Sequence, residues 1–115
     1  MNLQEIVYAL DLKIINEGKP LDTTEPSGGY ASDLLSCVMA GAKQGFVWVT
    51  LQAHLNIIAV AALLDLSAII VTEGAQPDSA TIVKAKEQSV TLLCTEMTTY
   101  EVAGKLWALG ITATR

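Results

Sequence analysis

At 115 residues the chain is long enough to form one domain with a hydrophobic core of its own. Its 12 acidic and 7 basic residues give a net charge of −5, and the basic residues are scattered along the chain. Nucleic acid is therefore not expected as a partner, because proteins bind phosphate backbones with concentrated Lys and Arg residues. No apolar run approaches the roughly 20 residues that span a bilayer, and the N-terminal residues lack the features of a secretory signal, so we expect a cytoplasmic protein without membrane contact.

The composition predicts an aliphatic core and a hidden surface. Hydrophobic residues make up 51% of the chain and aromatic residues 5%, as expected for a sheet covered by helices. The mean hydropathy of +0.42 is high for a small domain, and we interpret the excess as surface that is buried in a homodimer. Cys37 and Cys94 lie far apart in apolar segments, which predicts buried free thiols, and their spacing matches no metal site.

The first elements in chain order are a short helix and a strand. Asn2 is a suitable cap for a helix over residues 3–10, and residues 12–15 are predicted to form a strand. A cluster of Gly, Pro, Asn and Asp residues then predicts a long loop over residues 16–29. Ser32 is expected to cap the next helix, whose apolar residues recur at helical spacing.

Three apolar runs, each ending in threonine, dominate the middle of the chain. Their terminal threonines are 22 and 23 residues apart, and a helical stretch fills each gap. This spacing is typical of β-α units that feed a parallel sheet. We therefore predict strands over residues 46–50, 68–72 and 91–95, with helices over residues 57–64 and 79–88 between them.

The remaining elements complete an α/β pattern. The helix over residues 57–64 starts after Asn56 as cap and is apolar on all sides, so we expect one side to cover the sheet and the other to meet a second subunit. Thr98 and Glu101 form a capping-box pattern that predicts a last helix, and residues 111–114 are interpreted as an edge strand. The predicted fold is a small three-layer α/β domain over residues 1–115, with a mostly parallel sheet of four to five strands flanked by helices.

The most polar connection at the end of a predicted strand is the segment over residues 50–56. It runs from a strand end to a helix start, where unpaired backbone N–H groups can hold an anion. If the segment is extended, its alternate side chains point to one side and can hydrogen-bond a small ligand. These side chains are Thr50, Gln52, His54 and Asn56. The alternative is that Asn56 only caps its helix, and that Gln52 and His54 are solvated or bonded locally.

The strand-end threonines and the single histidine each allow two interpretations. Thr50, Thr72 and Thr95 would meet at one edge of a parallel sheet and could line a shared pocket, or they could simply be β-branched residues that suit strand ends. His54 could serve a small enzyme only if folding brings a carboxylate or hydroxyl to it, because neither Ser nor Cys lies beside it in the sequence.

Several blocks of the sequence resemble the DRTGG domain family. The likeness covers residues 28–111 and is strongest in residues 33–36 and 48–61. The matching blocks are Ser32-Asp33-Leu34-Leu35-Ser36, Val47-Trp48-Val49-Thr50, residues 52–61, residues 69–74 with Pro77, and Thr99-Tyr100-Glu101. The Asp-Arg-Thr-Gly-Gly string that names the family is absent, so any nucleotide contact that it makes does not transfer to this chain.

The resemblance implies an α/β domain similar to the N-terminal domain of HPr kinase/phosphorylase, without the kinase domain and its phosphate-binding loop. Such domains associate as dimers or larger assemblies, and in some regulated pyrophosphatases a DRTGG domain sits between nucleotide-sensing CBS domains, at the dimer interface. The resemblance therefore implies a regulatory or assembly role, with a nucleotide as the candidate ligand and no catalytic cofactor.

Three functional hypotheses follow. The leading one is a non-catalytic domain that forms a homodimer and binds a small ligand at the edge where the strands end. Its candidate ligand-binding residues are Thr50, Gln52, His54, Asn56, Asp33, Ser36, Thr72 and Thr95. The second is a module that only assembles, with itself or with another protein, through the helix over residues 57–64. The third is a small enzyme that uses His54.

Overall fold

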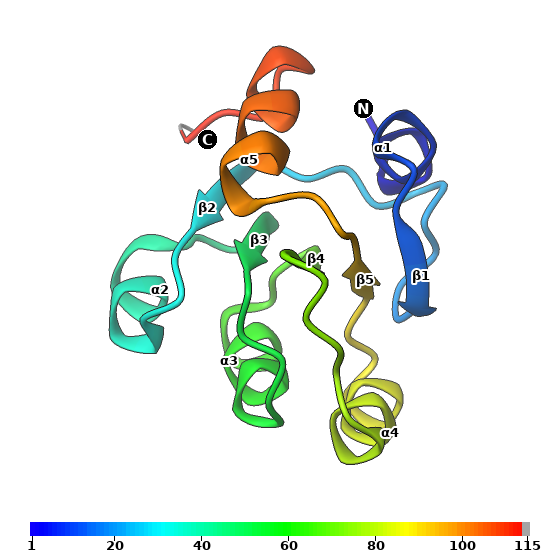
Figure 1. Ribbon diagram of the computed structural model, residues 1–115, viewed down its shortest axis with the longest axis vertical. Helices are drawn as coiled ribbons and strands as arrows, with labels where there is room; N and C mark the ends of the chain where they lie inside the picture. Colours follow the sequence, from blue (N-terminus) through cyan, green and yellow to red (C-terminus); the bar gives the residue numbers. More distant parts are fainter. Residues whose placement is uncertain (114–115) are drawn as a thin grey trace.

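The computed structural model describes residues 1–113 and has three layers, with a five-stranded sheet between two sets of helices (Figure 1). In chain order the elements are α1 (Leu3–Leu10), β1 (Lys13–Asn16), β2 (Gly28–Ala31), α2 (Leu35–Gly41), β3 (Phe46–Thr50), α3 (Asn56–Leu64), β4 (Ala68–Val71), α4 (Ser79–Gln88), β5 (Leu92–Cys94) and α5 (Thr99–Ala108). Helices α2, α3 and α4 cover one face of the sheet, and α1 and α5 cover the other.

Strand pairing places the ends of β3, β4 and β5 at one edge of the sheet. The strand order is β1-β5-β4-β3-β2, in which β2 to β5 run parallel and β1 is antiparallel to β5. The Thr72 N–H donates to the Thr50 carbonyl at 2.9 Å, and the Thr95 N–H donates to the Val71 carbonyl at 2.9 Å. The predicted α/β fold, with a mostly parallel sheet whose strand-end threonines lie side by side, is confirmed.

The sheet is buried on both faces, which explains why its strands are almost continuously apolar. In β3, Phe46 and Trp48 face the layer of α2, α3 and α4, whereas Val47 and Val49 face α1 and α5. Trp48 is fully buried, and its indole N–H donates to the Ser32 carbonyl at 2.9 Å. The strands thus lie between two hydrophobic cores, one on either side of the sheet.

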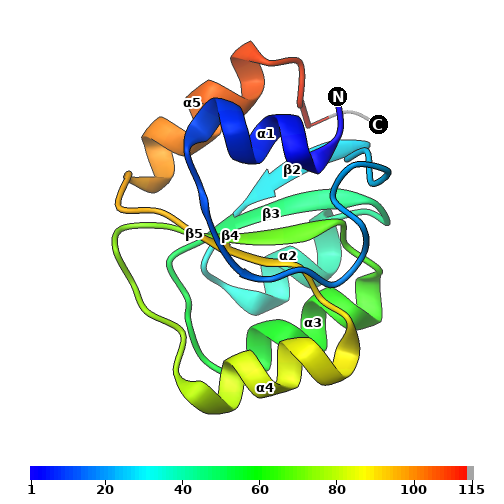
Figure 2. The ribbon, with the colours of Figure 1, turned by 90° about the vertical axis from the view of Figure 1, so that its right-hand side faces the viewer.

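The connections leave the sheet in opposite directions after β4 and β5. The chain passes from β3 through α3 to β4, and from β4 through α4 to β5, on the same face of the sheet (Figures 1 and 2). After β5 it crosses to the other face and forms α5. Because ligand crevices in parallel sheets open where neighbouring loops diverge, this topology directs attention to the ends of β4 and β5.

Two predictions between β1 and β3 are wrong. Residues 28–31 form the edge strand β2, although part of them was expected in the long loop. Glycine is rare in strands, so the two glycines of β2 do not indicate a strand in the sequence. In the structure, a Cβ at Gly28 would lie 2.6 Å from a ring carbon of Phe46, so no side chain fits there. The next helix begins at Leu35, and the Ser32 hydroxyl does not cap it but bonds within the preceding turn.

The helix caps agree with prediction at α1 and α5 but not at α3. Asn2 and Glu5 bind each other's backbone N–H groups at the start of α1. Thr98 caps α5 and accepts a hydrogen bond of 3.2 Å from the Glu101 N–H. Asn56 is the first residue of α3 rather than its cap, and the capping residue before it contributes no side-chain bond.

The structure also contradicts two further predictions, the C-terminal edge strand and the burial of the Cys37 thiol. Residues 111–113 are not a strand, although the Thr112 carbonyl accepts a bond of 2.8 Å from the Gly29 N–H of β2, and residue 114 lies outside the described residues. Cys94 is buried as predicted. Cys37 is exposed, because on α2 it lies to the side of Val38, the residue that enters the core.

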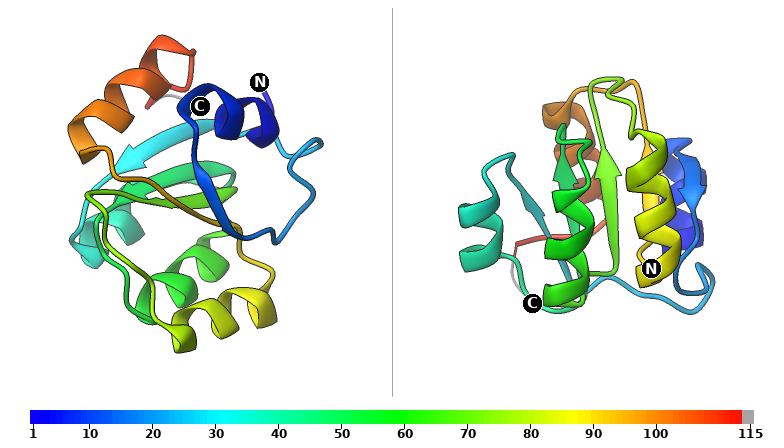
Figure 3. Two further views of the ribbon diagram at one scale, coloured as in Figure 1. Left: turned by 45° about the vertical axis from the view of Figure 1, so that its right-hand side comes forward. Right: turned by 90° about the horizontal axis from the view of Figure 1, so that it is seen from below.

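Helix α3 owes its apolar composition largely to contacts within its own chain. It lies between α2 and α4, as seen from below in Figure 3, and also covers the sheet. Its buried residues are Ile57, Ile58, Val60 and Ala61. The apolar side chains that it leaves exposed are Ala59 and Leu63, so its free surface is a narrow stripe and not a full half of the helix.

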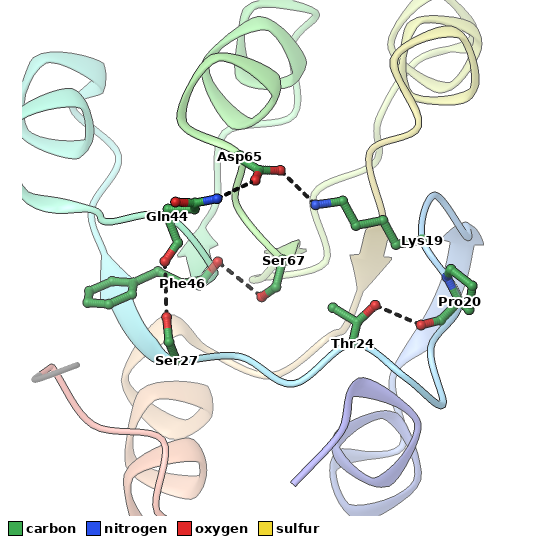
Figure 4. A network of polar contacts seen from close by, with 8 residues as sticks. All are labelled: Lys19, Pro20, Thr24, Ser27, Gln44, Phe46, Asp65 and Ser67. Carbon is green, nitrogen blue, oxygen red and sulfur yellow. Dashed lines mark hydrogen bonds and ion pairs between the residues drawn. The ribbon is translucent and has the colours of Figure 1, made fainter.

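A network of polar contacts fastens the segment between β1 and β2 to the edge of the sheet opposite the strand-end threonines (Figure 4). Asp65 follows α3 in the left-handed conformation, with φ of 54°. Its carboxylate accepts hydrogen bonds from the Lys19 ammonium at 2.6 Å and from the Gln44 amide at 2.9 Å. The Ser27 hydroxyl donates to the Gln44 carbonyl at 3.0 Å, so the long loop is bound to α3 and to the start of β3.

We expect Asp65→Asn to reduce the loss of stability at acid pH. Hydrogen bonds from Lys19 and then Gln44, together with the Lys19 charge, hold the pKa of Asp65 below its ordinary value of 3.8. The carboxylate therefore stabilises the fold above that value, and this contribution is lost as the pH falls through the lowered pKa of the folded state. Because the pair is half exposed, Asp65→Asn should cost at most about 1 kcal/mol at neutral pH, measured by urea unfolding.

Asp11→Asn is the matched control for this experiment. Asp11 also follows a helix in the left-handed conformation, which Asn tolerates, and within residues 1–113 it forms no ion pair. If the free energy of unfolding falls by the same amount on acidification in the wild type and in Asp65→Asn, the ion pair of Asp65 with Lys19 does not stabilise the fold.

Gly18 lies so close to the start of β5 that a side chain has no room. Its N–H donates to the Thr91 hydroxyl at 3.0 Å, and a Cβ would overlap the Ser89 backbone and lie 2.7 Å from the carbonyl carbon of Val90. We expect Gly18→Ala to lower the free energy of unfolding by about 1–3 kcal/mol, because overpacking displaces the backbone. Gly29→Ala, whose Cβ would make ordinary contacts at 3.5–3.7 Å, is the control, and equal losses in denaturation of both variants would contradict the steric explanation.

Candidate functional site

The residues that follow β3, β4 and β5 lie together at one end of the sheet, and we call this end the rim. It consists of residues 50–56, 72–76 and 95–99. In the view from below, the arrows of β3 and β4 point to this end, where the connections to α3, α4 and α5 begin (Figure 3). Every residue of the predicted ligand site except Asp33 and Ser36 belongs to the rim.

Asp33 ties the end of β3 to the turn before α2. Its Oδ1 accepts hydrogen bonds from the Thr50 hydroxyl at 2.8 Å and from the Leu51 N–H at 2.9 Å. The Gln52 amide donates to the Asp33 carbonyl at 3.0 Å, and the Gln52 N–H donates to the Thr50 hydroxyl at 3.1 Å. The structure therefore brings Asp33, Thr50 and Gln52 together, but most of their hydrogen-bonding capacity is used within the chain, and Thr50 is fully buried.

The other predicted residues near β3 are separate from this network. His54, Asn56 and Ser36 are exposed, Ser36 on α2 and Asn56 on α3. The chain turns at His54, whose carbonyl accepts a hydrogen bond of 3.1 Å from the Ile57 N–H. The condition for an alternating row over residues 50–56, an extended backbone, is therefore not met beyond residue 53.

The loops after β4 and β5 are bonded to each other at the point where they diverge. The Thr72 and Thr99 hydroxyls are 2.6 Å apart, and the Glu73 carboxylate accepts a bond of 2.8 Å from the Thr99 N–H. The Glu73 N–H donates to the Met97 carbonyl at 2.8 Å. The crevice that the topology would open between β4 and β5 is thus closed by hydrogen bonds of the chain itself.

A cavity of about 450 Å³ lies beside this closed crevice, and we call it the β5 cavity. It is bounded by the end of β5, the loop after β4 and the junction of α1 with β1. Its lining residues are Leu10, Asp11, Lys13, Gln76, Cys94, Thr95, Glu96 and Met97. Thr95 is the one predicted site residue that lines it. Sequence reasoning missed Lys13 because its approach to Thr95 depends on the antiparallel pairing of β1 with β5, and it missed Gln76, which the loop after β4 brings to the end of β5.

Cys94 and His54 are the groups at or beside the rim that could act as a nucleophile or a base. Burial raises the pKa of the Cys94 thiol, so it stays protonated at neutral pH. Within residues 1–113 the His54 ring donates no hydrogen bond to a side chain. Hydrogen bonds from the Thr81 hydroxyl and N–H, and to a lesser degree the His54 charge, lower the pKa of Asp78, whose carboxylate is already bound to Thr81.

Residues 1–113 contain no group of three or more His, Cys, Asp or Glu side chains placed to hold a metal ion. None of the helices formed by these residues is long and apolar enough to cross a membrane.

Replacement of Asp33 tests whether its network is structural. Asp33→Ala leaves the buried Thr50 hydroxyl and the Leu51 N–H without their acceptor, so we expect the free energy of unfolding to fall by about 1–3 kcal/mol. Ser36→Ala, three residues away at an exposed position, should change it by less than about 0.5 kcal/mol. Chemical denaturation of both variants measures the difference, and equal effects would mean that the network contributes nothing.

Comparisons with known proteins agree with this architecture. A crystal structure of the CBS and DRTGG domains of the regulatory region of Clostridium perfringens pyrophosphatase, complexed with the activator diadenosine tetraphosphate, is similar with a TM-score of 0.77 and 19% sequence identity. The match covers 97% of this chain and 48% of that one, so this chain spans about half the length of that structure. At this identity the likeness concerns the fold.

The sequence comparison is more specific. No curated protein is significantly similar to the chain. The family model described as the DRTGG domain matches residues 36–109, which is more than half of the chain and includes the rim. The chain therefore belongs to the DRTGG domain family.

Proposed function

We propose that this chain is a non-catalytic regulatory domain that binds a small ligand of the nucleotide class at the rim and assembles as a homodimer. Membership of the DRTGG family supports a regulatory role. The similar solved structure belongs to a regulatory region that was crystallised with a dinucleotide activator, which supports a nucleotide as the class of ligand.

The β5 cavity is the observation that carries the proposed ligand site. Its volume of about 450 Å³ lies within the range of roughly 300–1,000 Å³ that is typical of small-molecule pockets. It adjoins the ends of β4 and β5, where loops leave to opposite faces of the sheet and α/β proteins commonly bind ligands. Thr95 therefore has a stronger case than Thr50 or Thr72, both of which are fully buried.

The lining of the β5 cavity suits a ligand with both hydroxyl and anionic groups. The Glu96 and Asp11 carboxylates can accept hydrogen bonds from ribose hydroxyls or a base amino group. The Lys13 ammonium can pair with a phosphate, and the Gln76 amide can donate or accept. Leu10 and Met97 supply an apolar wall for a base.

The loop after β3 is a second part of the same proposed site. Leu51 and Leu55 are 44% and 46% exposed beside the Asp33 network. Helix α3 starts without a side-chain cap, but the Ile57 and Ile58 N–H groups already donate to the His54 and Leu55 carbonyls, so a ligand here would meet side chains. His54 and Asn56 stand at the same helix start, which keeps them in the proposal as contacts for a longer ligand.

Isothermal titration calorimetry with AMP, ATP and diadenosine tetraphosphate tests the proposal. We expect at least one of them to bind, and Gln76→Ala with Glu96→Gln to weaken its binding by roughly tenfold or more, since each removes a polar contact. Gln52→Ala with Asn56→Ala examines the β3 part of the rim. Gln88→Ala, an exposed amide at the far end of α4, is the control and should bind like the wild type.

The outcomes separate the two parts of the rim. A ligand present at about 100 times its dissociation constant should also stabilise the fold by roughly 2.7 kcal/mol in a thermal-shift measurement. Loss of binding only in the Gln52 and Asn56 double variant would move the site to the loop after β3. Absence of binding and of stabilisation with all three nucleotides would refute the proposed ligand class and leave the assembly module as the function.

A further inference from the structure

The outer face of α5 combines exposed aromatic rings, a glycine and opposite charges. Tyr100 is 90% exposed and Trp107 is 61% exposed, and both lie on this one helix. The exposed residues of α5, which we call the α5 face, are Tyr100, Glu101, Gly104, Lys105, Trp107 and Ala108. At 100° per residue, Tyr100 and Trp107 lie on one flank of Gly104, and Glu101 and Lys105 lie on the other.

Gly104 has no purpose within the described chain. Glycine in a helix interior costs about 1 kcal/mol relative to alanine. A Cβ at this position would meet nothing within 4 Å, so no neighbour in residues 1–113 requires its absence. A glycine at the centre of an exposed helix face is explained if another backbone approaches there, because only glycine lets two helices come so close.

We infer that the α5 face binds the α5 face of a second copy of this chain, with the two helices antiparallel and crossing at Gly104. The inference rests on the homodimer of the proposed function and gives its interface. A two-fold axis makes such an interface isologous, so each contact occurs twice.

The charges and rings on α5 favour a second copy in this orientation. Tyr100 lies four residues before Gly104 and Trp107 lies three residues after it, so antiparallel pairing brings Tyr100 against the partner's Trp107. On the other flank the same symmetry brings Glu101 towards the partner's Lys105, and the opposite charges attract. A parallel pair would place each ring against the charged flank of the partner.

A cavity beside Trp107 offers a place for the partner's tyrosine. It has a volume of about 330 Å³ and lies between α5 and the edge strand β2. Its mostly apolar lining includes Tyr30, Ala103, Leu106, Trp107 and Ile111. Ala103 and Trp107 are on the flank of α5 that carries Tyr100, so the partner's Tyr100 reaches this cavity in the antiparallel pair. An aromatic anchor in an apolar pocket is the usual centre of binding energy.

The area available is consistent with a dimer. A buried aromatic side chain contributes about 150–250 Å². Because Tyr100 is 90% exposed and Trp107 is 61% exposed, the four rings of two copies supply on the order of 450–750 Å². A specific interface buries roughly 1,200 Å² or more, and the rest of the α5 face and the cavity wall must supply the remainder. The stripe on α3 is a weaker candidate, because Leu63 is its single large exposed side chain and α3 has no charged residue to set an orientation.

Sedimentation velocity of the full chain tests the interface. Gly104→Arg should convert the dimer to a monomer, since it places a long cation at the crossing point, while its circular dichroism and melting temperature should show a folded protein because the site has free space and Arg is a better helix former than Gly. Ala59→Arg, which adds the same cation to the exposed stripe of α3, is the matched control and should remain a dimer.

Charge exchange gives a second, independent test. Glu101→Lys alone should raise the dissociation constant of the dimer, because it places a lysine against the partner's Lys105 in both symmetry-related contacts. Glu101→Lys combined with Lys105→Glu should restore the dimer. A dimer that persists in Gly104→Arg, or one lost in Ala59→Arg but not in Gly104→Arg, would overturn the α5 interface.

These outcomes are separable from failure of the proposed function. If the Gly104→Arg variant is still a dimer, the proposed homodimer stands and only the assignment of its interface to α5 is wrong. A wild-type chain that is monomeric at its highest soluble concentration removes both the homodimer and the α5 interface, whereas nucleotide binding is measured independently in either case.

Discussion

The parallel pairing of β3, β4 and β5 is the constraint on which the rest of the molecule depends. It brings three strand ends to one edge and leaves the loops after them to form the rim. Because the crossovers after β3 and β4 lie on one face and α5 lies on the other, the divergence of loops falls between β4 and β5. The hydrogen bond from the Thr99 N–H to the Glu73 carboxylate and the one between the Thr72 and Thr99 hydroxyls close that crevice, and the open volume lies next to it, against β1.

The local pattern of the sequence was sufficient for the fold but not for the site. Apolar runs at a 22–23 residue spacing predict the parallel strands, because a buried strand is apolar on both faces whatever its neighbours are. The sequence does not predict the edge strand β2, because it contains two glycines, and the need for Gly28 arises from the Phe46 ring that packs against it. The likeness to the N-terminal domain of HPr kinase/phosphorylase, by contrast, stays a prediction.

Prediction of the candidate site was limited by contacts between distant residues. Thr50, Gln52 and Asp33 were chosen for their polar side chains, and they do meet, but mainly to satisfy one another. A polar residue in an apolar chain can thus serve to bind a ligand or to satisfy another buried polar group of the chain, and its position in the sequence does not distinguish the two roles. Lys13 belongs to the β5 cavity only through the pairing of β1 with β5, which is a contact across most of the chain.

The two proposals meet at the start of α5. Met97 lines the β5 cavity, and its carbonyl binds the Glu73 N–H, while the Glu73 carboxylate binds the Thr99 N–H in the first turn of α5. A ligand that shifts Met97 therefore acts on the helix whose outer face is proposed to hold the second copy. If ligand binding changes the dimer affinity by some factor, dimerisation must change the ligand affinity by the same factor, because the coupling free energy is reciprocal. We propose that the hydrogen bonds through Glu73 transmit the occupancy of the β5 cavity to the α5 face.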